Sequence, residues 1–432
     1  MPTSSRSKRV LLYSHDSFGL GHVSRCRTIA NAIVEADHSV SVLILSGSPI
    51  IGSYEFRSGI DFVRVPGVVK QIDTGEYDSA NLRVGVEHTL EMRTRIIRDT
   101  ADIYRPDLFI VDKEPLGLRG EVGPALRLLK ERGTPLVLGL RDVMDDPAML
   151  AEEWDRKNVV PALRDLYDEI WVYGLPQINK PMAGIDLPPS VRHKTVYTGY
   201  LHRELPLHAD VPHEIGEIDG PFFLVTAGGG GDGDGLIDWV LASYEADPHI
   251  PYGAVIVFGP YMSAVAREAF RERAAKFRNI RTLTFTNNLG ALMQRAAGVV
   301  AMGGYNTFCE ILSFDKRAII VPRTRPRLEQ FIRARAARNL GLVEMLEADK
   351  GRDPHAMATA LRQLPQQGLP SDVIVPGLLD GLGNVWRLVS KQLMHPHRRP
   401  ASLDAVEAPS SPPMEVDRAA DAPVVASSRT RT

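Results

Sequence analysis

The stretch PFFLVTAGGGGDGDG, residues 221–235, decides the fold class of this chain. Its first part, residues 221–226, is an apolar run with aromatic and β-branched side chains, which predicts a buried strand. The glycine-dense part that follows costs conformational entropy, which is tolerable where a backbone must touch a ligand. Either this segment is a floppy surface loop, or its exposed N–H groups cradle a pyrophosphate without a lysine, at Gly228, Gly229 and Gly230.

The same order of strand, glycine turn and helix opens the chain. Residues 9–13 are a short apolar run, and Gly19-Leu20-Gly21-His22 then begins a helix that continues to Val34. Other apolar runs predict further strands at residues 40–45, 108–111, 136–138, 169–173, 254–258, 280–285, 298–301 and 317–321. Strands and helices that alternate at this spacing indicate parallel, doubly wound sheets with right-handed crossovers.

The expected architecture is α/β, with two Rossmann-like domains that face a cleft. A chain of 432 residues suits two such domains and a tail better than one core. A stretch rich in His, Pro, Asp and Glu separates the two strand-and-helix patterns and predicts a linker. The expected parts are a flexible start at 1–8, an acceptor domain at 9–205, a linker at 206–220, a donor domain at 221–375, a helical segment at 376–394 and a disordered tail at 395–432.

Composition excludes several classes of protein. A formal net charge of −2 argues against nucleic acid as the main partner, because binding to its backbone needs a dense basic surface. The two cysteines, Cys26 and Cys309, are too few for a disulfide framework and fit a reducing cytoplasm. No apolar run reaches the roughly 18 residues of a membrane span, so any contact with a membrane would be peripheral, at its inner face.

The first glycine turn carries the candidate catalytic residue. Gly19 and Gly21 let the backbone approach a ligand on the acceptor side, at the N-terminus of a helix. The neutral imidazole of His22 is a suitable general base for a sugar hydroxyl, although it could instead cap or pack against the helix start. Ser24 stands where the dinucleotide-binding fingerprint needs a third glycine, which disfavours a dinucleotide site.

Three further segments follow predicted strands. Asp112 and Glu114 could position the acceptor, or could serve as helix caps and loop ion pairs. Glu310 follows a strand and a glycine turn; it could accept two hydrogen bonds from a ribose, or could be a solvated helix residue. Bidentate pairing with a diphosphate leaving group is expected from Arg323, Arg325 and Arg327. No group of residues has the spacing of a metal site, so neither a metal nor a cofactor is expected.

Taken together, these motifs resemble glycosyltransferase family 28, which includes the N-acetylglucosaminyltransferase that completes the lipid-linked peptidoglycan precursor. The resemblance spans residues 10–346 and is sharp only at the motifs. It implies the GT-B fold, a nucleotide-sugar donor as substrate and His22 as a candidate base. It also implies donor-binding roles, for the phosphates, the uracil, the ribose and the sugar, at Arg203, Thr286, Gly303, Gly304, Thr307, Glu310, Glu329 and Gln330.

Two departures separate this chain from that pattern. The second glycine loop, residues 228–231, lacks the family's serine, so phosphate contact is left to backbone N–H groups. Phe331 stands where the family has a second glutamine, which leaves the donor sugar open. We therefore expect metal-independent, inverting transfer from a UDP-sugar to a hydroxyl acceptor, in cell-envelope or exopolysaccharide synthesis, with a lipid-linked acceptor as one option. The alternatives are a UDP-sugar hydrolase, an epimerase on the same fold, or a non-catalytic nucleotide-sugar sensor.

Overall fold

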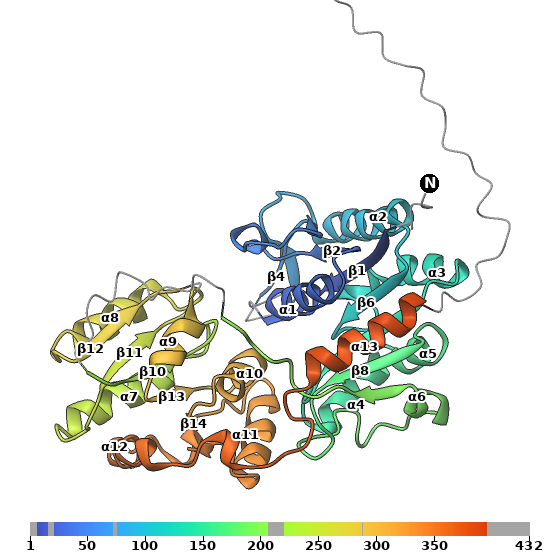
Figure 1. The fold of residues 1–432 in the computed structure, drawn as a ribbon. Coiled ribbons are helices and arrows are strands. Elements are labelled where there is room, and N and C mark those ends of the chain that lie inside the picture. Colours follow the sequence, from blue (N-terminus) through green and yellow to red (C-terminus); the bar gives the residue numbers. More distant parts are fainter. Residues whose placement is uncertain (1–6, 16–20, 72–75, 206–219, 287, 395–432) are drawn as a thin grey trace, which may run out of the picture.

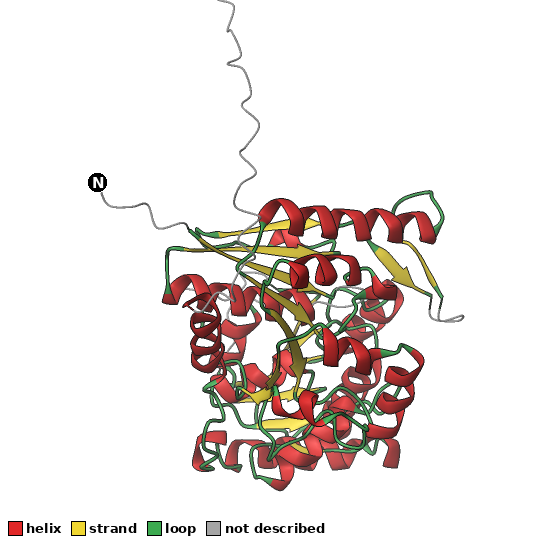
Figure 2. Cartoon of the chain, turned by 90° about the vertical axis from the view of Figure 1, so that its right-hand side faces the viewer, coloured by secondary structure: helices red, strands yellow, loops and turns green. Residues whose placement is uncertain are grey.

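The computed structural model describes residues 7–15, 21–71, 76–205, 220–286 and 288–394, which form two α/β domains (Figure 1). A view at right angles shows helices on both faces of the strands (Figure 2). The predicted fold class is therefore confirmed. The expected N-terminal segment, linker and tail fall largely on residues 1–6, 206–219 and 395–432, outside the described residues.

The first domain is built on a parallel sheet of seven strands in the order β3-β2-β1-β6-β7-β8-β9. Its inner strands are continuous apolar runs because helices cover both faces of the sheet. The strands are β1 (Lys8–Ser14), β2 (Val40–Ser46), β3 (Ile60–Arg64), β6 (Leu108–Asp112), β7 (Leu136–Arg141), β8 (Glu169–Tyr173) and β9 (Thr195–Tyr197). A separate antiparallel hairpin consists of β4 (Val68–Lys70) and β5 (Tyr77–Ser79).

Helix α1 shows why the crossovers pack as they do. Val23, Cys26, Ala30 and Ile33 recur at a spacing of three to four residues, which places them on one buried stripe against the sheet. The other helices of this domain are α2 (Val86–Tyr104), α3 (Gly123–Glu131), α4 (Pro147–Arg156), α5 (Val159–Asp165) and α6 (Pro189–His193); α1 itself is Gly21–Ala36.

The second domain repeats the plan with a parallel sheet of six strands in the order β12-β11-β10-β13-β14-β15. All residues of its central strand β10 (Phe222–Thr226) are buried. The other strands are β11 (Gly253–Val257), β12 (Ile280–Leu283), β13 (Gly298–Ala301), β14 (Ala318–Ile320) and β15 (Glu344–Met345). The helices are α7 (Asp234–Ala246), α8 (Ala264–Ala274), α9 (Leu289–Arg295), α10 (Tyr305–Ser313), α11 (Glu329–Asn339) and α12 (Pro354–Gln363).

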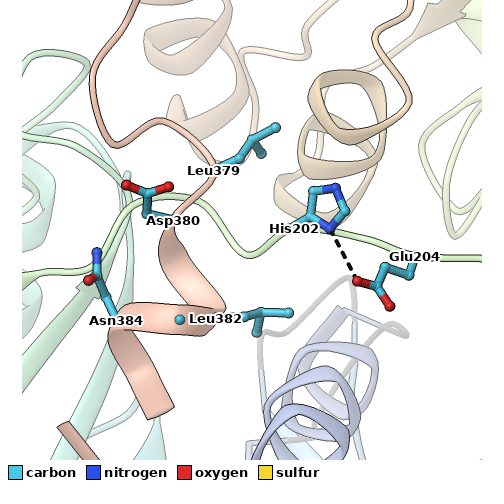
Figure 3. A pocket seen from close by; sticks show the side chains of 7 residues that line it. His202, Glu204, Leu379, Asp380, Leu382 and Asn384 are labelled. Atoms are coloured by element: carbon cyan, nitrogen blue, oxygen red, sulfur yellow. Dashed lines mark ion pairs between the residues drawn. The ribbon is translucent and has the colours of Figure 1, made fainter. Parts of the chain in front are cut away.

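The chain then returns to the first domain, where helix α13 (Gly381–Met394) packs against α1 (Figure 1). The chain thus passes between the domains twice, and these two crossings meet near Tyr200 and Gly381. There the backbone N–H of Tyr200 donates to the carbonyl of Leu378 (2.8 Å), and that of Gly381 donates to the carbonyl of Tyr200 (3.1 Å). A Cβ at Gly381 would lie 2.4 Å from that carbonyl oxygen, so only glycine permits this approach. A small hollow of about 430 Å³, which His202 and Asn384 help to line, lies beside the crossings (Figure 3).

Candidate active site

Both sheets place their glycine turns where the strand order reverses. In the first sheet the reversal lies between β1 and β6, and in the second it lies between β10 and β13. Ligands of open α/β sheets bind outside the carboxyl ends of the strands at such a point. Most of the site residues that the sequence predicts lie in the segments that follow these four strands.

At the first reversal, His22 and Asp112 form a close pair. Nδ1 of His22, in the first turn of α1, lies 2.5 Å from Oδ2 of Asp112, the last residue of β6. Arg25, one helical turn after His22, donates to both carboxylate oxygens of Asp112, at 2.7 and 2.6 Å. His22 is partly buried and Asp112 is only 3% exposed, so the pair is largely removed from water.

The electrostatics fix the protonation state of this pair. Burial alone would raise the pKa of Asp112, but Arg25 and His22 outweigh it and hold that pKa well below its ordinary value. Burial lowers the pKa of His22 to about 4, against the opposing effects of its hydrogen bond to Asp112 and of that carboxylate's charge. An ionised carboxylate only accepts, so Nδ1–H of a neutral His22 donates to Asp112 and leaves the lone pair on Nε2.

The glycine loop after β10 is held by its own backbone. Gly228 and Gly230 have φ values of 63° and 87°, and a Cβ at Gly230 would lie 2.4 Å from the carbonyl oxygen of Phe258. Only glycine therefore fits at Gly230. Tyr261 N–H donates to the carbonyl of Gly229 at 2.9 Å.

The N–H of Gly228 donates to Oγ1 of Thr226 at 3.3 Å, and that of Gly230 donates to the carbonyl of Ala227 at 3.2 Å. Of the three amides predicted to bind phosphate, only that of Gly229 therefore has no hydrogen-bond partner in the described part of the chain, and the amide of Gly231 has none there either.

The second glycine turn leads into helix α10. Gly303 has a φ of 77° with Ile320 against it, whereas a side chain at Gly304 would meet open space. Thr307 lies in the first turn of α10 and Glu310 in the next. Burial raises the pKa of Glu310 to about 7, although Arg203 opposes this rise. None of the described residues forms a hydrogen bond with the Glu310 carboxylate.

Helix α10 brings this turn to the His22–Asp112 pair. Asn306 Nδ2 donates to the carbonyl oxygen of Gly21 at 3.0 Å, next to His22. Arg203 Nη2 donates to Asn306 Oδ1 at 2.8 Å, and Arg203 Nη1 donates to Thr28 on α1. In this structure Arg203 therefore joins α1 to α10, and its buried Nε has no partner among the described residues. Gly19 lies outside the described residues.

Two other predicted donor residues lie on the second domain. Thr286 follows β12, and its hydroxyl accepts a hydrogen bond from the N–H of Asn288 at 3.0 Å. Gln330 is 8% exposed and its Oε1 accepts from the N–H of Arg323 at 3.1 Å. Thr286 follows β12 at one edge of the sheet, whereas Gln330 lies on α11, the helix that follows β14, and three strands separate β14 from β12 in the same sheet.

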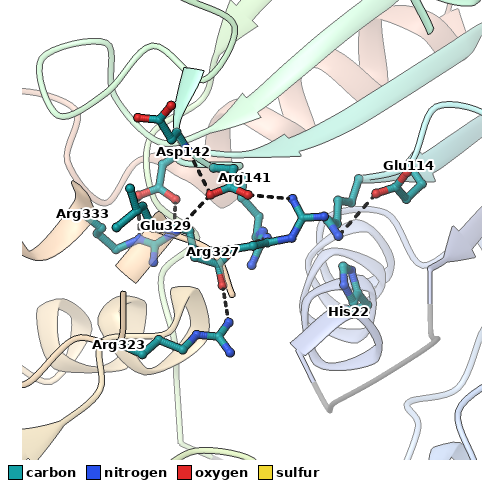
Figure 4. Close-up of polar contacts among 12 residues, drawn as sticks. His22, Glu114, Arg141, Asp142, Arg323, Arg327, Glu329 and Arg333 are labelled. Atoms are coloured by element: carbon teal, nitrogen blue, oxygen red, sulfur yellow. Dashed lines mark hydrogen bonds and ion pairs between the residues drawn. The ribbon is translucent and has the colours of Figure 1, made fainter. Parts of the chain in front are cut away.

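Glu329 joins the two domains. It begins α11, it is 5% exposed, and it accepts from Arg141 of the first domain at 2.6 Å and from Arg323 at 3.0 Å. Burial opposes ionisation of Glu329, but Arg141 and its neighbouring arginines lower its pKa to about 2. Asp142, which directly follows β7, forms a buried bidentate pair with Arg333 of α11, at 2.8 and 2.6 Å (Figure 4).

Between the domains lies a cavity of about 1460 Å³, which His22 lines together with residues of both domains. Glu114 lines it too, on the first-domain wall, and accepts a hydrogen bond from Lys157 at 2.9 Å. The described side chains around the cavity include three glutamates, Glu114, Glu153 and Glu329, and a larger set of cations: Lys113, Arg119, Arg141, Arg156, Lys157, Arg323, Arg325 and Arg327.

Sequence reasoning missed four residues of this site. Arg25 could have been recognised from its position three residues after His22, which places both on one face of α1. Arg141 and Lys113 each lie at the end of a first-domain strand, the edge at which the sequence already places Asp112 and Glu114. His15, at the end of β1, packs edge-on against His22 with ring centres 5.6 Å apart.

The described residues contain neither a group placed to bind a metal ion nor a helix suited to span a membrane. Within residues 7–15, 21–71, 76–205, 220–286 and 288–394, no group of three or more His, Cys, Asp and Glu side chains is placed to hold a metal ion. Over the same ranges, none of the helices combines the length and the apolar character needed to cross a bilayer.

Comparison with known proteins shows which proteins resemble this chain. Residues 224–369 match the family model of the glycosyltransferase family 28 C-terminal domain. An uncharacterised glycosyltransferase of Methanosarcina acetivorans is 22% identical over 409 residues, which cover 87% of this chain and 96% of that protein.

Two solved structures share the fold of the whole chain. MurG of Acinetobacter baumannii superposes with a TM-score of 0.53 at 13% identity, covering 89% of this chain and 99% of that one. A UDP-glucose:anthocyanidin 3-O-glucosyltransferase, solved in complex with UDP, superposes with a TM-score of 0.56 at 12% identity, covering 90% and 95%. The chain is a glycosyltransferase with the GT-B fold, and its second domain matches the glycosyltransferase family 28 C-terminal domain over residues 224–369.

Proposed function

We propose that this glycosyltransferase moves a sugar from a UDP-sugar to a hydroxyl acceptor, with inversion at the anomeric carbon and without a metal ion. The observation that carries the proposal is the His22–Asp112 pair, which lies at the reversal of the first sheet and is tied to the glycine turn of the second domain through Asn306. A direct displacement requires a base for the acceptor hydroxyl on one wall of the cavity and groups that bind the leaving diphosphate on the other wall.

In the proposed reaction, Nε2 of His22 takes the proton of the acceptor hydroxyl. The acceptor oxygen forms its bond to the anomeric carbon while the bond from that carbon to the diphosphate oxygen breaks, so the electron pair leaves with UDP. Asp112 stabilises the imidazolium that forms and keeps the lone pair on the nitrogen that faces the substrate. Attack from the face opposite the leaving group gives inversion.

The second domain supplies the groups proposed to receive the leaving diphosphate. The N–H groups of Gly229 and Gly231 have no partner among the described residues, and Arg323 lies beside them through its ion pair with Asp232. Dipoles and guanidinium groups fixed in place before the reaction stabilise charge as it develops. A divalent ion is then not required for departure. Glu310 and Thr286 are proposed to hold the ribose and the uracil, following the family resemblance.

The direct test measures free UDP from a panel of UDP-sugars, with and without candidate acceptors. Release that depends on an acceptor supports transfer, whereas equal release without one indicates a hydrolase. Conversion of the UDP-sugar without release of UDP indicates an epimerase, and tight binding without turnover indicates a sensor. Retained activity in EDTA supports the metal-free mechanism, and the anomeric configuration of the product, read by NMR, tests inversion.

A matched pair of variants ties the result to the site. His22→Gln should lower turnover about 100-fold or more, because general-base catalysis contributes roughly that much, while UDP binding stays within twofold. His38→Gln is the control, since His38 is an exposed histidine of the turn that follows α1. Unchanged turnover in His22→Gln would remove His22 as the base.

A further inference from the structure

Tyr305 is an aromatic residue of the second domain that contacts an arginine beside the proposed base. It begins helix α10, directly after the glycine turn of Gly303 and Gly304, and it is 4% exposed. Cζ of Arg25, on α1 of the first domain, lies over its ring, 5.4 Å from the ring centre. A guanidinium within about 6 Å of a ring centre is attracted by the ring face, and more strongly where water is excluded. This contact therefore joins the donor turn to the helix that carries His22.

The guanidinium of Arg25 leaves one side for the ring of Tyr305. Its Nε and Nη2 donate to the two oxygens of Asp112, at 2.7 and 2.6 Å, whereas none of the described residues accepts a hydrogen bond from its Nη1. Arg25 is only 1% exposed, so water does not solvate the remaining side of the cation. A buried charge needs partners on every side, and the ring face of Tyr305 is the partner that α10 supplies.

Two further contacts hold the Tyr305 ring independently of Arg25. Tyr200 stacks on it, with ring centres 6.0 Å apart and planes inclined by 27°. Cζ of Arg333, on α11, lies 5.7 Å from the centre of the same ring. Arg333 also donates to the carbonyl oxygen of Gly303 at 3.0 Å, and so it holds the turn that precedes Tyr305. The ring is thus a fixed support against which Arg25 packs.

This support extends to the base through two charged groups. Arg25 binds both oxygens of Asp112, and Oδ2 of Asp112 lies 2.5 Å from Nδ1 of His22. Nη2 of Arg25 itself lies 3.0 Å from the same nitrogen. A guanidinium that shifts takes the carboxylate with it, because a bidentate pair is held at two points. Since a misplacement of about 1 Å costs roughly 100-fold in rate, the position of Tyr305 affects the proton transfer.

We infer that Tyr305 is a positioning residue for the proposed base: packed against Arg25, it holds Asp112 and His22 in the geometry that proton transfer needs. The inference rests on the proposed function of His22. Because Tyr305 belongs to the second domain, the base has this geometry only where the donor turn has docked on α1. Activation of the acceptor is in this way tied to closure of the two domains.

The first test is a series of substitutions in the full chain. The buried hydroxyl of Tyr305 lacks a hydrogen-bond partner within the described ranges, so Tyr305→Phe should keep turnover within about twofold. Tyr305→Leu removes the ring face and should lower turnover by about tenfold or more, while UDP affinity stays within about threefold. The matched control is Phe308→Leu, on the same helix, whose ring lies edge-on to Tyr200 with centres 5.2 Å apart; it should keep turnover within about threefold.

A second measurement separates the ring face from packing volume. A trifluorinated phenylalanine at position 305 keeps the shape of the ring and withdraws electrons from its face. If the ring holds Arg25 by cation–π attraction, turnover should fall by about threefold or more relative to Tyr305→Phe. A role in packing alone would leave the two proteins equal.

Nuclear magnetic resonance of the chain labelled at histidine reports on the base itself. The Nδ1–H proton of His22 is assigned by its absence from His22→Gln, and its hydrogen bond to Asp112 should place it far downfield. We expect this signal in the wild type, in Tyr305→Phe and in Phe308→Leu. In Tyr305→Leu the signal should shift upfield or be lost.

Four results would overturn the inference: normal turnover in Tyr305→Leu, equal losses in Tyr305→Leu and Phe308→Leu, no effect of fluorination, or a wild-type spectrum without the His22 signal. Loss of UDP affinity in Tyr305→Leu, with Phe308→Leu unaffected, would also overturn it, because the ring would then belong to the donor subsite. Failure of the proposed function has a different signature, since His22→Gln would then keep full turnover.

Discussion

Nδ1 of His22 lies 2.5 Å from Oδ2 of Asp112, although 90 positions separate the two residues in the chain. The contact exists because β1 and β6 are neighbours at the point where the strand order of the first sheet reverses. His22 follows β1 and Asp112 ends β6, so the topology brings the imidazole and the carboxylate to one place. The contact between His22 and Asp112 therefore depends on the fold, and a substitution of either residue tests its role.

Asp112→Asn should lower turnover in the same direction as His22→Gln, by about 100-fold, because an amide no longer holds the imidazole in the tautomer whose lone pair is on Nε2. UDP-sugar affinity should stay within threefold. Steady-state kinetics and calorimetry measure the two effects. Asp61→Asn, on the exposed face of the edge strand β3, is the control. Full turnover in Asp112→Asn would show that the pair has only a structural role.

The lowered pKa of His22 also predicts how stability depends on pH. Its pKa is about 4 in the folded chain and about 6.5 when unfolded, so between these values the unfolded state binds more protons. The contribution of neutral His22 to the stability of the folded chain is therefore present above pH 6.5 and is lost as pH falls toward 4. When the pH falls from 7 to 5, the free energy of unfolding should fall by about 2 kcal/mol more in the wild type than in His22→Gln.

Denaturant unfolding at the two pH values, in both proteins, measures this difference. Other titrating groups, His15 included, are present in both chains and cancel in the comparison. An equal loss of stability in wild type and variant would show that His22 titrates normally in the folded protein.

Glu310 predicts a pH-dependent donor affinity. Burial raises its pKa to about 7, so the carboxyl is partly protonated near neutrality. If the carboxylate accepts hydrogen bonds from the ribose, the ligand favours the ionised form, and UDP-glucose should bind several-fold more tightly at pH 8 than at pH 6. Calorimetry at both pH values, with Glu310→Gln as comparison, should show this dependence in the wild type alone. A flat profile in the wild type would remove Glu310 from the ribose site.

Much of the fold and the local part of the site could be predicted from the sequence. The inner strands are continuous apolar runs, and each is followed by a helix pattern, so the parallel sheets are encoded locally. The edge strands β3 and β9 were missed because their side chains are mostly half-buried or exposed and show no apolar run. His22 and the glycine turns were found because each is a short motif at a strand end.

Contacts between the domains could not be predicted in this way. The ion pair of Arg141 with Glu329 and the bridge from Arg203 to Thr28 both depend on how the two domains close. The chain passes between the domains at Tyr200 and Gly381, and Tyr200 stacks on Tyr305 after the second glycine turn with ring centres 6.0 Å apart, a contact that no local motif encodes. The family resemblance assigned Arg203 and Glu329 to the donor, but it carried no information on what each contacts in the absence of a ligand.

The buried pair of Asp142 and Arg333 provides the last prediction, because it joins β7 of the first domain to α11 of the second. Arg333 donates to both carboxylate oxygens and to the carbonyl of Gly303, while Tyr200 donates to Asp142 at 2.7 Å. Arg333→Met would leave the Asp142 carboxylate buried without its counter-ion, at a cost of about 3–5 kcal/mol in the free energy of unfolding.

The double variant Asp142→Asn with Arg333→Met should recover part of that loss, since the uncompensated charge is gone. Arg338→Met, an exposed change on the same helix, should alter stability by less than about 0.5 kcal/mol. Because the pair spans the domains, calorimetry of Arg333→Met should also resolve two transitions where the wild type shows one. A single transition at the wild-type temperature would mean that the glycine turn at Gly303 is held toward the first domain by other contacts, such as that of Asn306 with Gly21.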